Sequence, residues 1–367
     1  MGLFWRVFVR PMMGLFGSET LHSISLKNIR IGSLPGLRAI LRGMYRSPAV
    51  QSEIMGLSFE NPVGMAAGMD KNGSNIPNWE NVGFGWIEIG GITFHPQEGN
   101  PKPRMFRSGK HSALINRMGF NNLGSEAMAV HLAKLKSKAK WASIPVGINL
   151  GKSKDTPNDE ADMDYAGTME RLWGFADLFV VNVSSPNTPN LRELQAGSEL
   201  DRILTACNDV NQRLAKDTGE KPKPILVKIS PDLADDQIKV IADTAMSQDC
   251  AGIVATNTTT SRPDEGGVMD QTGGLSGSPL RARSTEVVRV LYAHTDGKLP
   301  IVGVGGISDV ESAWEKIAAG ASLLQLYSAL VFEGPGVMKV INKGLNRKLK
   351  EHGYKSLSEA VGHAHRS

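Results

Sequence analysis

The sequence predicts an α/β protein, a (β/α)8 or TIM barrel with a small N-terminal helical extension. After residue 50, eight short apolar runs recur with helical patterns between them, and polar residues follow their carboxyl ends. Apolar runs without strict alternation are typical of parallel strands that are covered on both faces. The expected strands are residues 63–66, 86–92, 145–150, 178–183, 224–229, 252–256, 300–304 and 323–327.

The composition indicates a folded protein in a reducing compartment. The 367 residues are 41% hydrophobic and 21% charged, close to globular averages, which excludes a disordered chain. The two cysteines, Cys207 and Cys250, stand far apart. Their spacing excludes a disulfide scaffold, a zinc ribbon and a cysteine-ligated iron–sulfur cluster, and no histidine spacing indicates a metal site.

Residues 1–50 hold the excess of positive charge. They carry seven Arg or Lys against a single acid, Glu19, whereas the net charge of the whole chain is +4. The remaining residues therefore sum to a slightly negative charge. A body without excess positive charge argues against nucleic acid as a partner.

Aromatic side chains and arginines alternate at the very N-terminus, at Phe4, Trp5, Arg6, Phe8, Arg10 and Phe16. Because the arginines interrupt each apolar run, neither a spanning helix nor a secretory signal fits this segment. We expect an amphipathic region that rests on anionic lipid. The alternative is a helix packed on the body with solvated arginines.

The segments between the expected strands carry helix signals. Residues 308–311, Ser-Asp-Val-Glu, have the pattern of a capping box, and Gly320 marks the end of the helix that follows. Repeated strand–helix–strand units imply parallel pairing, and eight such units match the barrel. A doubly wound sheet is the alternative, but no Gly-x-Gly-x-x-Gly motif follows a first strand and opens a helix.

Polar residues cluster where a barrel has its active site, at the carboxyl ends of the strands. These residues are Asp70, Lys71, Asn149, Asn182, Ser184, Ser185, Lys228, Thr256, Asn257 and Thr258. Lys71 and Lys228 lie in apolar sequence, where a lysine needs an anion or an electron-rich acceptor unless its amine reaches solvent. The asparagines suit a planar ligand with carboxylate, carbonyl and N–H groups, such as a pyrimidine, although each one alone is also a common turn residue.

Glycines follow the seventh expected strand, and Tyr327 and Ser328 follow the eighth. The loops after strands seven and eight of such a barrel commonly bind phosphate, because glycines let backbone N–H groups approach it. Plain turn geometry is the alternative explanation for these glycines. No Ser-His-Asp order is present, so the sequence does not favour hydrolysis.

Five motifs, taken together, closely resemble those of the dihydroorotate dehydrogenase family. They are Ala66-Ala67-Gly68-Met69-Asp70-Lys71-Asn72-Gly73, Asn116-Arg117-Met118-Gly119-Phe120-Asn121-Asn122, Asn182-Val183-Ser184-Ser185-Pro186-Asn187-Thr188, Ala255-Thr256-Asn257-Thr258-Thr259 and Gly273-Gly274-Leu275-Ser276-Gly277. The resemblance runs from about residue 20 to residue 345. The basic N-terminal extension and the serine after the fourth strand are similar to the class 2 branch, which is membrane-associated and reduces quinone, whereas class 1 relatives have a cysteine in that loop.

The resemblance implies FMN as cofactor at the mouth of the barrel. The implied contacts are Ala67, Gly68, Met69, Asp70, Lys71, Gly91, Asn149, Asn182, Lys228, Thr256, Gly277, Gly305, Gly306, Tyr327 and Ser328, the last five, from Gly277 on, around its phosphate. Lys228 beside the flavin ring would favour the negative charge that develops on reduction. Family members commonly have threonine at the position of Gly91, so we expect one side-chain contact to the flavin to be lost.

The resemblance implies dihydroorotate as substrate, oxidised to orotate in the synthesis of UMP. The implied substrate contacts are Lys71, Asn116, Arg117, Met118, Gly119, Phe120, Asn182, Asn187, Asn257 and Thr258, with Lys71 facing the carboxylate. Ser185 would remove the C5 proton while hydride passes from C6 to flavin N5. A serine needs a dry site and an outlet for the proton, for which Thr188 and an ordered water are suitable.

The resemblance further implies a membrane quinone as electron acceptor, with His22, Arg107 and Tyr327 as candidate contacts. The expected parts are residues 1–50 as the basic extension at the bilayer surface, residues 51–350 as the barrel and residues 351–367 as a polar C-terminal tail. We expect a monomer, peripheral to the cell membrane or inner membrane on its cytoplasmic side.

Three other functions remain as alternatives. A flavin barrel that reduces uridines in RNA would show a basic body and usually a catalytic cysteine. A non-redox phosphate-binding barrel would be colourless when purified. A membrane-docking protein without catalysis would leave the five motifs without a role.

Overall fold

Eight parallel strands close into a barrel in the order β10-β12-β13-β3-β4-β7-β8-β9. The structure is a computed structural model that describes residues 5–13, 16–31, 34–46, 48–138, 140–263 and 266–366. Each barrel strand begins and ends within one residue of its predicted range, so the predicted (β/α)8 fold is confirmed. The strands are β3 (Val63–Met65), β4 (Trp86–Ile92), β7 (Val146–Leu150), β8 (Leu178–Asn182), β9 (Ile225–Ile229), β10 (Gly252–Ala255), β12 (Ile301–Val304) and β13 (Leu323–Leu326).

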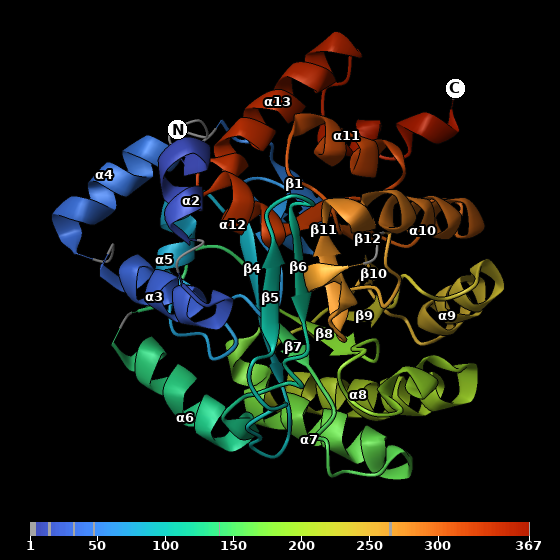
Figure 1. The fold of residues 1–367 in the computed structure, drawn as a ribbon. Helices are drawn as coiled ribbons and strands as arrows, with labels where there is room; N and C mark the ends of the chain where they lie inside the picture. The colour runs from blue at the N-terminus through green and yellow to red at the C-terminus, as the bar shows by residue number, and fades with distance from the viewer. Residues whose placement is uncertain are drawn as a thin grey trace.

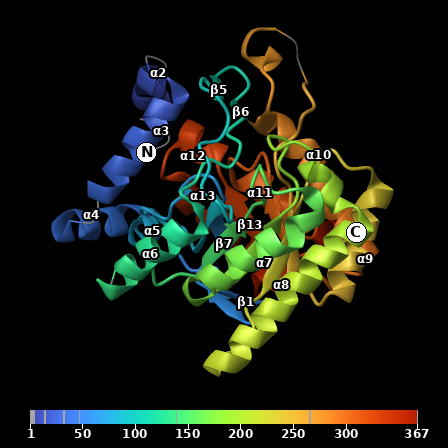
Figure 2. The ribbon, with the colours of Figure 1, turned by 90° about the horizontal axis from the view of Figure 1, so that it is seen from below.

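Helices surround the barrel strands on the outside (Figures 1 and 2). One or more helices follow each strand, because each crossover between parallel neighbours must return along the outside of the sheet. In chain order these helices are α5 (Ile76–Trp79), α6 (Gly124–Ser137), α7 (Ala161–Leu172), α8 (Gly197–Thr218), α9 (Asp235–Ser247), α10 (Arg281–His294), α11 (Val310–Ala318), α12 (Ser328–Glu333) and α13 (Val337–Glu351).

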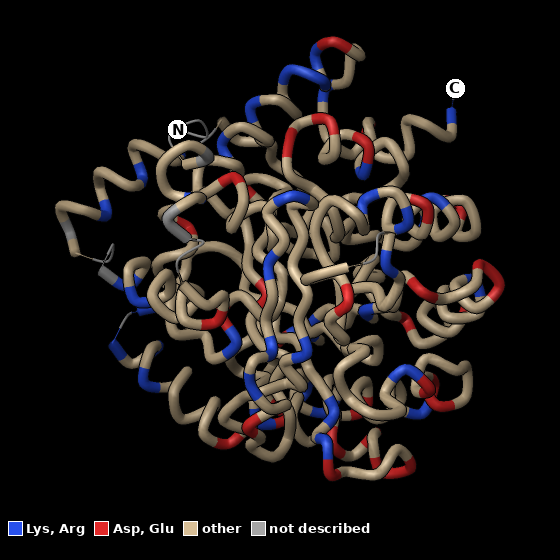
Figure 3. Tube along the Cα trace, in the orientation of Figure 1, with Lys and Arg blue, Asp and Glu red and all other residues tan. Residues whose placement is uncertain are grey.

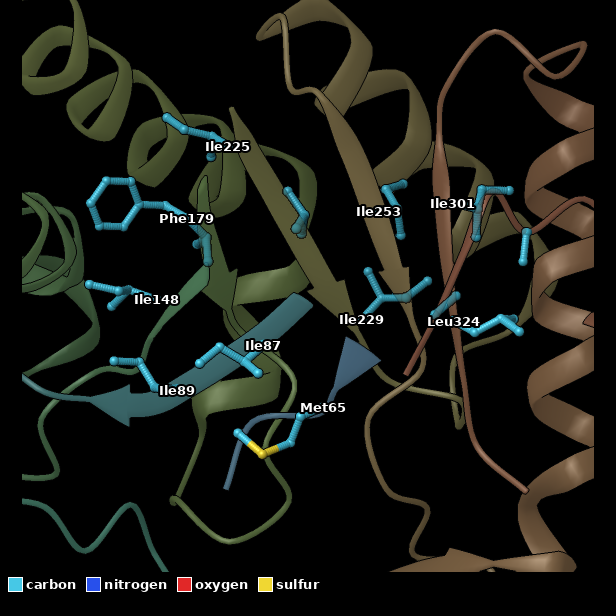
Figure 4. Close-up of a cluster of buried hydrophobic side chains, with 14 of the residues drawn as sticks. Met65, Ile87, Ile89, Ile148, Phe179, Ile225, Ile229, Ile253, Ile301 and Leu324 are labelled. Atoms are coloured by element: carbon cyan, nitrogen blue, oxygen red, sulfur yellow. The ribbon is translucent and has the colours of Figure 1, made fainter. Parts of the chain in front are cut away.

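Alternation along the strands separates two sets of buried side chains. One set packs against the helices, and Figure 4 shows its members Ile87, Ile148, Phe179, Ile253 and Ile301 on neighbouring strands. The residues between them point into the barrel and form a second apolar cluster, which includes Trp86, Leu178, Val180, Leu226, Val254, Val302 and Leu323. Two residues further along β4, β9 and β13 the inward set becomes polar, with Glu88, Lys228 and Gln325. The interior of the barrel is therefore apolar toward the amino ends of the strands, which we call its lower part, and polar toward their carboxyl ends.

Two small antiparallel sheets, which the sequence did not predict, cover the ends of the barrel. The hairpin of β1 (Ser52–Ile54) and β2 (Leu57–Phe59) packs against the lower apolar cluster, where the Phe59 ring meets Trp86 edge-on at 6.1 Å. A sheet in the order β11-β6-β5 joins β5 (Met105–Ser108) and β6 (Ala113–Asn116) to β11 (Gly274–Gly277). This sheet brings the second and fifth sequence motifs side by side.

The N-terminal helices lie to one side of the barrel in both ribbon views (Figures 1 and 2). They are a π-helical turn (Trp5–Val9), α2 (Arg10–Met13), α3 (Ser18–Ile31) and α4 (Pro35–Tyr45). Figure 3 shows Lys and Arg positions along these helices, whereas both signs of charge mix over the barrel. Within the described parts of the chain, no helix has both the length and the apolar character needed to cross a membrane.

Ion pairs with the barrel hold these helices. Glu19 of α3 lies 2.9 Å from Arg104, and Arg38 and Arg42 of α4 lie 2.8 and 2.5 Å from Glu80. Part of the basic charge of residues 1–50 is thus directed toward the body. Phe4 lies outside the described residues.

The N-terminal cap of α11 lies one residue later in the chain than the sequence pattern predicts. Helix α11 is capped by Asp309, whose Oδ1 accepts the Ser312 N–H at 2.8 Å, so the expected cap at Ser308 with Glu311 as its partner is wrong. Asp309 is the better acceptor because a carboxylate also interacts favourably with the positive end of the helix dipole.

The segment expected as a polar C-terminal tail contributes to the core. Beyond α13, the apolar side chains of Leu357 and Ala360 in α14 (Leu357–Ala360) are buried.

Candidate active site

A cavity opens at the carboxyl ends of the barrel strands, with about 1040 Å³ of empty space including the part open to solvent. It gathers residues from loops that are far apart in the sequence. The predicted cofactor and substrate residues that line it are Ala67, Gly68, Lys71, Gly91, Asn116, Met118, Gly119, Phe120, Asn149, Asn182, Ser185, Asn187, Lys228, Thr256, Asn257, Thr258, Gly277, Gly305, Gly306, Tyr327 and Ser328.

A buried carboxylate, Glu88, organises the floor of the cavity. Its Oε1 accepts a hydrogen bond from Asn149 Nδ2 at 2.5 Å and lies 3.3 Å from Lys228 Nζ. Its Oε2 accepts a hydrogen bond from Gln325 Nε2. A buried charge needs a partner and hydrogen bonds to offset the loss of hydration. Glu88 therefore neutralises Lys228 and fixes the orientation of both amides.

Two polar groups on this floor retain unused hydrogen-bonding capacity. An ammonium has three N–H donors, and among the described residues Glu88 is the one acceptor within reach of Lys228. Gln325 Oε1 is buried and accepts no hydrogen bond from the described residues. Because buried polar groups are normally satisfied, this floor is suited to a ligand with both acceptors and donors.

Asparagine side chains orient one another around the cavity. Asn182 Nδ2 donates to Asn149 Oδ1 at 3.0 Å, and Asn257 Nδ2 donates to Asn182 Oδ1 at 3.2 Å. On the other wall, Asn187 Nδ2 donates to Asn116 Oδ1 at 3.3 Å. These contacts fix which end of each amide faces the cavity. The set is thus preorganised for a planar polar ligand.

Ser185 lies in the loop after β8, at the edge of this asparagine set. Its side chain is buried, and its Oγ accepts the backbone N–H of Asn187 at 3.3 Å. A hydrogen bond donated to the oxygen favours its anionic form. Arg192 holds the loop by donating to the carbonyls of Ser184 and Thr258 at 3.2 and 3.1 Å. Ser185 therefore lies in a loop that Arg192 anchors, with little of its side chain exposed.

Lys71 supplies positive charge on the opposite wall. Its Nζ donates to Asn121 Oδ1 at 2.5 Å. Burial and the nearby Arg104 together lower the pKa of Lys71 to about 7, against the opposing effect of Glu19. An anion bound beside Lys71 would raise this pKa again, because it favours the charged amine.

The glycine-rich end of the cavity lies against the first turn of α10. A Cβ on Gly305 would lie 2.7 Å from Ser284 Oγ, and one on Gly306 would lie 2.4 Å from the Cβ of Arg281. Both glycines have positive φ, at 112° and 70°. Only glycine allows this backbone to lie so close to the helix N-terminus, where free N–H groups favour an anion.

Three predicted residues do not line this cavity. Met69 lines the second cavity described below. Asp70 is buried in its own turn and accepts hydrogen bonds from the N–H groups of Ser74 and Asn75 and from Trp79 Nε1. Burial raises the pKa of Asp70, and these three hydrogen bonds oppose that shift. Asp70 therefore stabilises the loop and does not face the ligand.

Arg117 is the third of these residues, and it points away from the cavity. Its guanidinium lies over the ring of Phe106 at 4.7 Å and donates to Gln271 Oε1, Thr272 Oγ1 and the Pro103 carbonyl. These contacts join β5 to the segment before β11. Arg117 thus supports the wall of the cavity from behind.

Several residues of the site were not identified from the sequence, namely Glu88, Leu280, Ile307 and Gln325. Glu88 had a usable signal, because it is a lone carboxylate in the apolar run of residues 86–92. Lys228 was singled out by the same argument, and pairing the two would have linked β4 to β9. Leu280 and Ile307 carry no comparable signal, since apolar residues are common in every element.

Gly91 occupies a narrow space between two site residues. A Cβ at this position would lie 2.8 Å from both Asn149 Oδ1 and a ring carbon of Phe120. In this chain Phe120 fills part of the volume that a larger residue at position 91 would need. The absence of a side chain at Gly91 is therefore matched by the packing around it.

A second cavity lies between the N-terminal helices and the barrel, with about 1280 Å³ of empty space including the part open to solvent. Helices α3 and α4 provide one wall, and the barrel provides Trp79, Leu330 and Val331. The predicted quinone contacts His22, Arg107 and Tyr327 all line it. Tyr327 also lines the first cavity, so the two cavities share this side chain as a wall.

His22 is neutral in this second cavity at physiological pH. Burial and the nearby Lys71 together lower the pKa of His22 to about 4. Glu19 and a hydrogen bond with the Met69 backbone oppose the shift. The cavity thus presents a polar but uncharged imidazole among largely apolar side chains.

The fold and the site together define a (β/α)8-barrel enzyme with a polar cavity at the carboxyl ends of its strands and a largely apolar cavity under its N-terminal helices. A family model for dihydroorotate dehydrogenase matches residues 49–349. The chain belongs to the dihydroorotate dehydrogenase family.

Relatives named "Dihydroorotate dehydrogenase (quinone)" are similar along most of their length. The protein from Gloeobacter violaceus is 48% identical over 318 residues, covering 87% of this chain and 86% of the relative. The protein from Anaeromyxobacter dehalogenans is 49% identical over 321 residues, with the same coverage. The crystal structure of DHODH from Eimeria tenella in complex with ferulenol has a TM-score of 0.87 and 36% identity, covering 95% of this chain and 96% of that one.

Proposed function

We propose that this chain oxidises dihydroorotate to orotate, a step of pyrimidine synthesis, and passes the electrons to a membrane quinone through FMN. The observation that carries the proposal is the shared wall between the two cavities at Tyr327. One cavity is polar and preorganised for a pyrimidine, and the other is apolar and lies under the N-terminal helices. A redox cofactor in the first cavity would lie next to ligands bound in either cavity.

The residues present fit a flavin. The unused donors of Lys228 and the unpartnered Gln325 Oε1 match a ring that carries carbonyl acceptors and an N–H donor. The glycine loop at Gly305 and Gly306 and the N-terminus of α10 match a phosphate. We therefore assign the ring to the floor formed by Asn149, Lys228 and Gln325, and the phosphate to the residues Gly277, Gly305, Gly306, Tyr327 and Ser328.

The remaining polar wall is assigned to the substrate. Lys71 faces the carboxylate, and Asn116, Asn187 and Asn257 bind the ring carbonyl and N–H groups. Ser185 Oγ takes the proton from C5, supported by the N–H of Asn187, and passes it toward Thr188 and solvent. When bound, FMN supplies the acceptor for the hydride that leaves C6. Lys228 holds a positive charge at the cavity floor, where it offsets negative charge that develops on reduction.

The direct test is anaerobic addition of dihydroorotate to the purified protein while the visible absorbance of the flavin is followed. Bleaching that a short-chain quinone then reverses is the expected result. A yellow protein that dihydroorotate leaves unchanged would contradict the substrate. A protein that holds no flavin would contradict the redox function as a whole.

We expect the affinity for orotate to fall as the pH rises above about 7. In the free protein Lys71 loses its proton near that pH. Binding the carboxylate then requires uptake of a proton, so the affinity falls by up to about tenfold per pH unit. The measurement is an orotate titration of the oxidised protein over a series of pH values. In Lys71→Met the affinity for orotate should be lower, and it should no longer depend on pH in this way. If the affinity of this variant falls with pH as steeply as that of the unmodified protein, Lys71 does not bind the carboxylate.

The second cavity is assigned to the quinone. Its apolar lining suits a lipid-soluble ring and tail, and His22, Arg107 and Tyr327 provide polar groups at its inner end. The helical lid of α3 and α4 gives a lipid-soluble acceptor a route that avoids bulk water. Tyr327, which lines both cavities, would then lie between a bound flavin and the quinone.

We assign residues 1–50 to the surface of the bilayer, which makes the protein a peripheral membrane protein on the cytoplasmic side. Among the described residues, eight of the fourteen exposed large hydrophobic side chains lie between residues 7 and 44. They are Val7, Phe8, Phe16, Ile24, Leu34, Leu37, Ile40 and Met44. Residues 51–350 then form the catalytic barrel, residues 351–367 close its C-terminal end, and the protein acts as a monomer.

Replacing Leu37, Ile40 and Met44 of α4 together with serine is expected to weaken binding to lipid vesicles by about tenfold or more, because each exposed apolar side chain adds to interfacial affinity. Sedimentation with vesicles that contain anionic lipid measures this. Bleaching by dihydroorotate should be unaffected.

The matched control replaces three exposed apolar residues of the barrel, Val130, Met163 and Val240, with serine. This control should bind vesicles as the unmodified protein does. Equal losses in both triple variants would contradict a membrane surface confined to the N-terminal helices.

A further inference from the structure

Lys316 on α11 is a buried cation outside both cavities. Its side chain is fully buried, and its Nζ donates to Ser284 Oγ at 2.5 Å, Thr285 Oγ1 at 2.7 Å and the Arg281 carbonyl at 3.2 Å. All three acceptors belong to the first turns of α10. The three N–H donors of the ammonium are therefore used, but by neutral groups only.

No carboxylate of the described residues lies within ion-pair distance of the Lys316 amine. The neighbouring Glu315 is instead paired with Arg281, at 2.5 Å. Burial lowers the pKa of Lys316 well below its usual range, Glu315 opposes this shift, and Arg281 and Arg289 add to it. A buried ammonium without a counter-ion is costly, so an anion bound nearby would be favoured.

The contacts of Lys316 lead directly to the glycine end of the first cavity. Ser284 Oγ, which accepts from Lys316, donates to the Gly305 carbonyl at 3.0 Å. Gly305 and Gly306 pack so closely on Ser284 and Arg281 that no Cβ fits between them. In its protonated form the Lys316 amine can only donate, so it directs the hydroxyl hydrogen of Ser284 away from itself, toward the carbonyls of Gly305 and Arg281.

We propose that Lys316 is a positioning residue of the flavin phosphate site: it holds the first turn of α10 against Gly305 and supplies from behind the positive charge that the phosphate neutralises. This inference rests on the proposed binding of FMN. The inference predicts that replacing Lys316 weakens the binding of a flavin that carries a phosphate and leaves the binding of a flavin without a phosphate nearly unchanged.

The test compares FMN with riboflavin, which has the same ring and no phosphate. Each is titrated into flavin-depleted protein prepared from the purified holoenzyme, and quenching of flavin fluorescence gives the affinity. In Lys316→Met, which keeps the length of the side chain without its charge, the affinity for FMN should fall by about tenfold or more. The affinity for riboflavin should change by less than about twofold.

A matched control is Lys152→Met. Lys152 is also buried and donates to backbone carbonyls, but these belong to Ser153 and Thr156 and not to α10, and Lys152 does not line the cavity. Its ratio of FMN to riboflavin affinity should equal that of the unmodified protein. If Lys316→Met does not fold, Ser284→Ala removes the link to Gly305 and should lower the same ratio by about threefold.

The outcomes separate the two proposals. A selective loss of FMN affinity supports the role of Lys316. Equal losses for both flavins, or no loss, overturn it while the proposed function stands, provided that the unmodified protein binds FMN and is bleached by dihydroorotate. An unmodified protein that binds neither flavin overturns both.

Discussion

Ser185→Ala is expected to slow the reduction of the bound flavin by dihydroorotate by about 10²–10⁴-fold, the usual contribution of a general base. Flavin binding and folding should be unchanged, because among the described residues Ser185 Oγ makes a single hydrogen bond, 3.3 Å long, from the Asn187 backbone N–H. Anaerobic stopped-flow measurement of flavin bleaching gives the rate. The substrate affinity, read from the dependence of that rate on dihydroorotate, should change little.

The adjacent serine provides the control. Ser184 is fully buried, and its hydroxyl donates to Asn182 Oδ1 and accepts from Asn257 Nδ2, but it does not line the cavity. Ser184→Ala should reduce the bleaching rate by less than about tenfold, through the orientation of Asn182 and Asn257. Equal effects of the two substitutions would mean that the loop, and not the Ser185 hydroxyl, determines the rate.

Lys228→Met is expected to lower the free energy of unfolding by about 3–5 kcal/mol and to abolish efficient reduction of the flavin. The first effect follows because Glu88, which is fully buried, would lose the cation 3.3 Å away. Removing one partner of a buried ion pair has a cost of this size. The second effect follows because the positive charge at the cavity floor would be lost. Urea unfolding of flavin-free protein and anaerobic bleaching measure the two effects separately.

The double variant Glu88→Gln with Lys228→Met distinguishes stability from catalysis. Removing both charges leaves no unpaired ion, so most of the lost stability should return. Bleaching by dihydroorotate should stay slow, because the cation is still absent. Recovery of both properties would mean that Lys228 serves only to balance Glu88.

The eight barrel strands could be predicted from the residues alone. An apolar run flanked by turn residues depends on local preferences, and each observed strand lies within one residue of its expected range. The motifs with Lys71 and Ser185, and Lys228 in its apolar run, were also accessible, because a barrel places the carboxyl ends of all its strands at one face. The sequence also excludes a cysteine in the Ser185 loop, because Cys207 and Cys250 lie elsewhere in the chain. Both cysteines are buried.

Partners distant in the chain could not be predicted in this way. Glu88 and Lys228 are 140 residues apart, and they meet because both point inward at the same level of the barrel. Asp70 was expected from its motif to contact the cofactor. Its carboxylate instead accepts hydrogen bonds from two backbone N–H groups of its own loop and from the Trp79 indole of α5. Motif membership places a residue near the site, but side-chain direction depends on the local turn.

The positions of Tyr327 and Lys316 follow from the way the barrel closes and its helices pack. Tyr327 borders both cavities because β13 pairs with β3, which brings the residue that follows β13 against the loop that carries Gly68 and Met69. Lys316 lies behind the glycine loop because α11 packs beside α10. The identity of the elements thus follows from short-range patterns of apolar and turn residues. The distances between charges, cavities and walls follow from long-range packing, which short-range patterns do not contain.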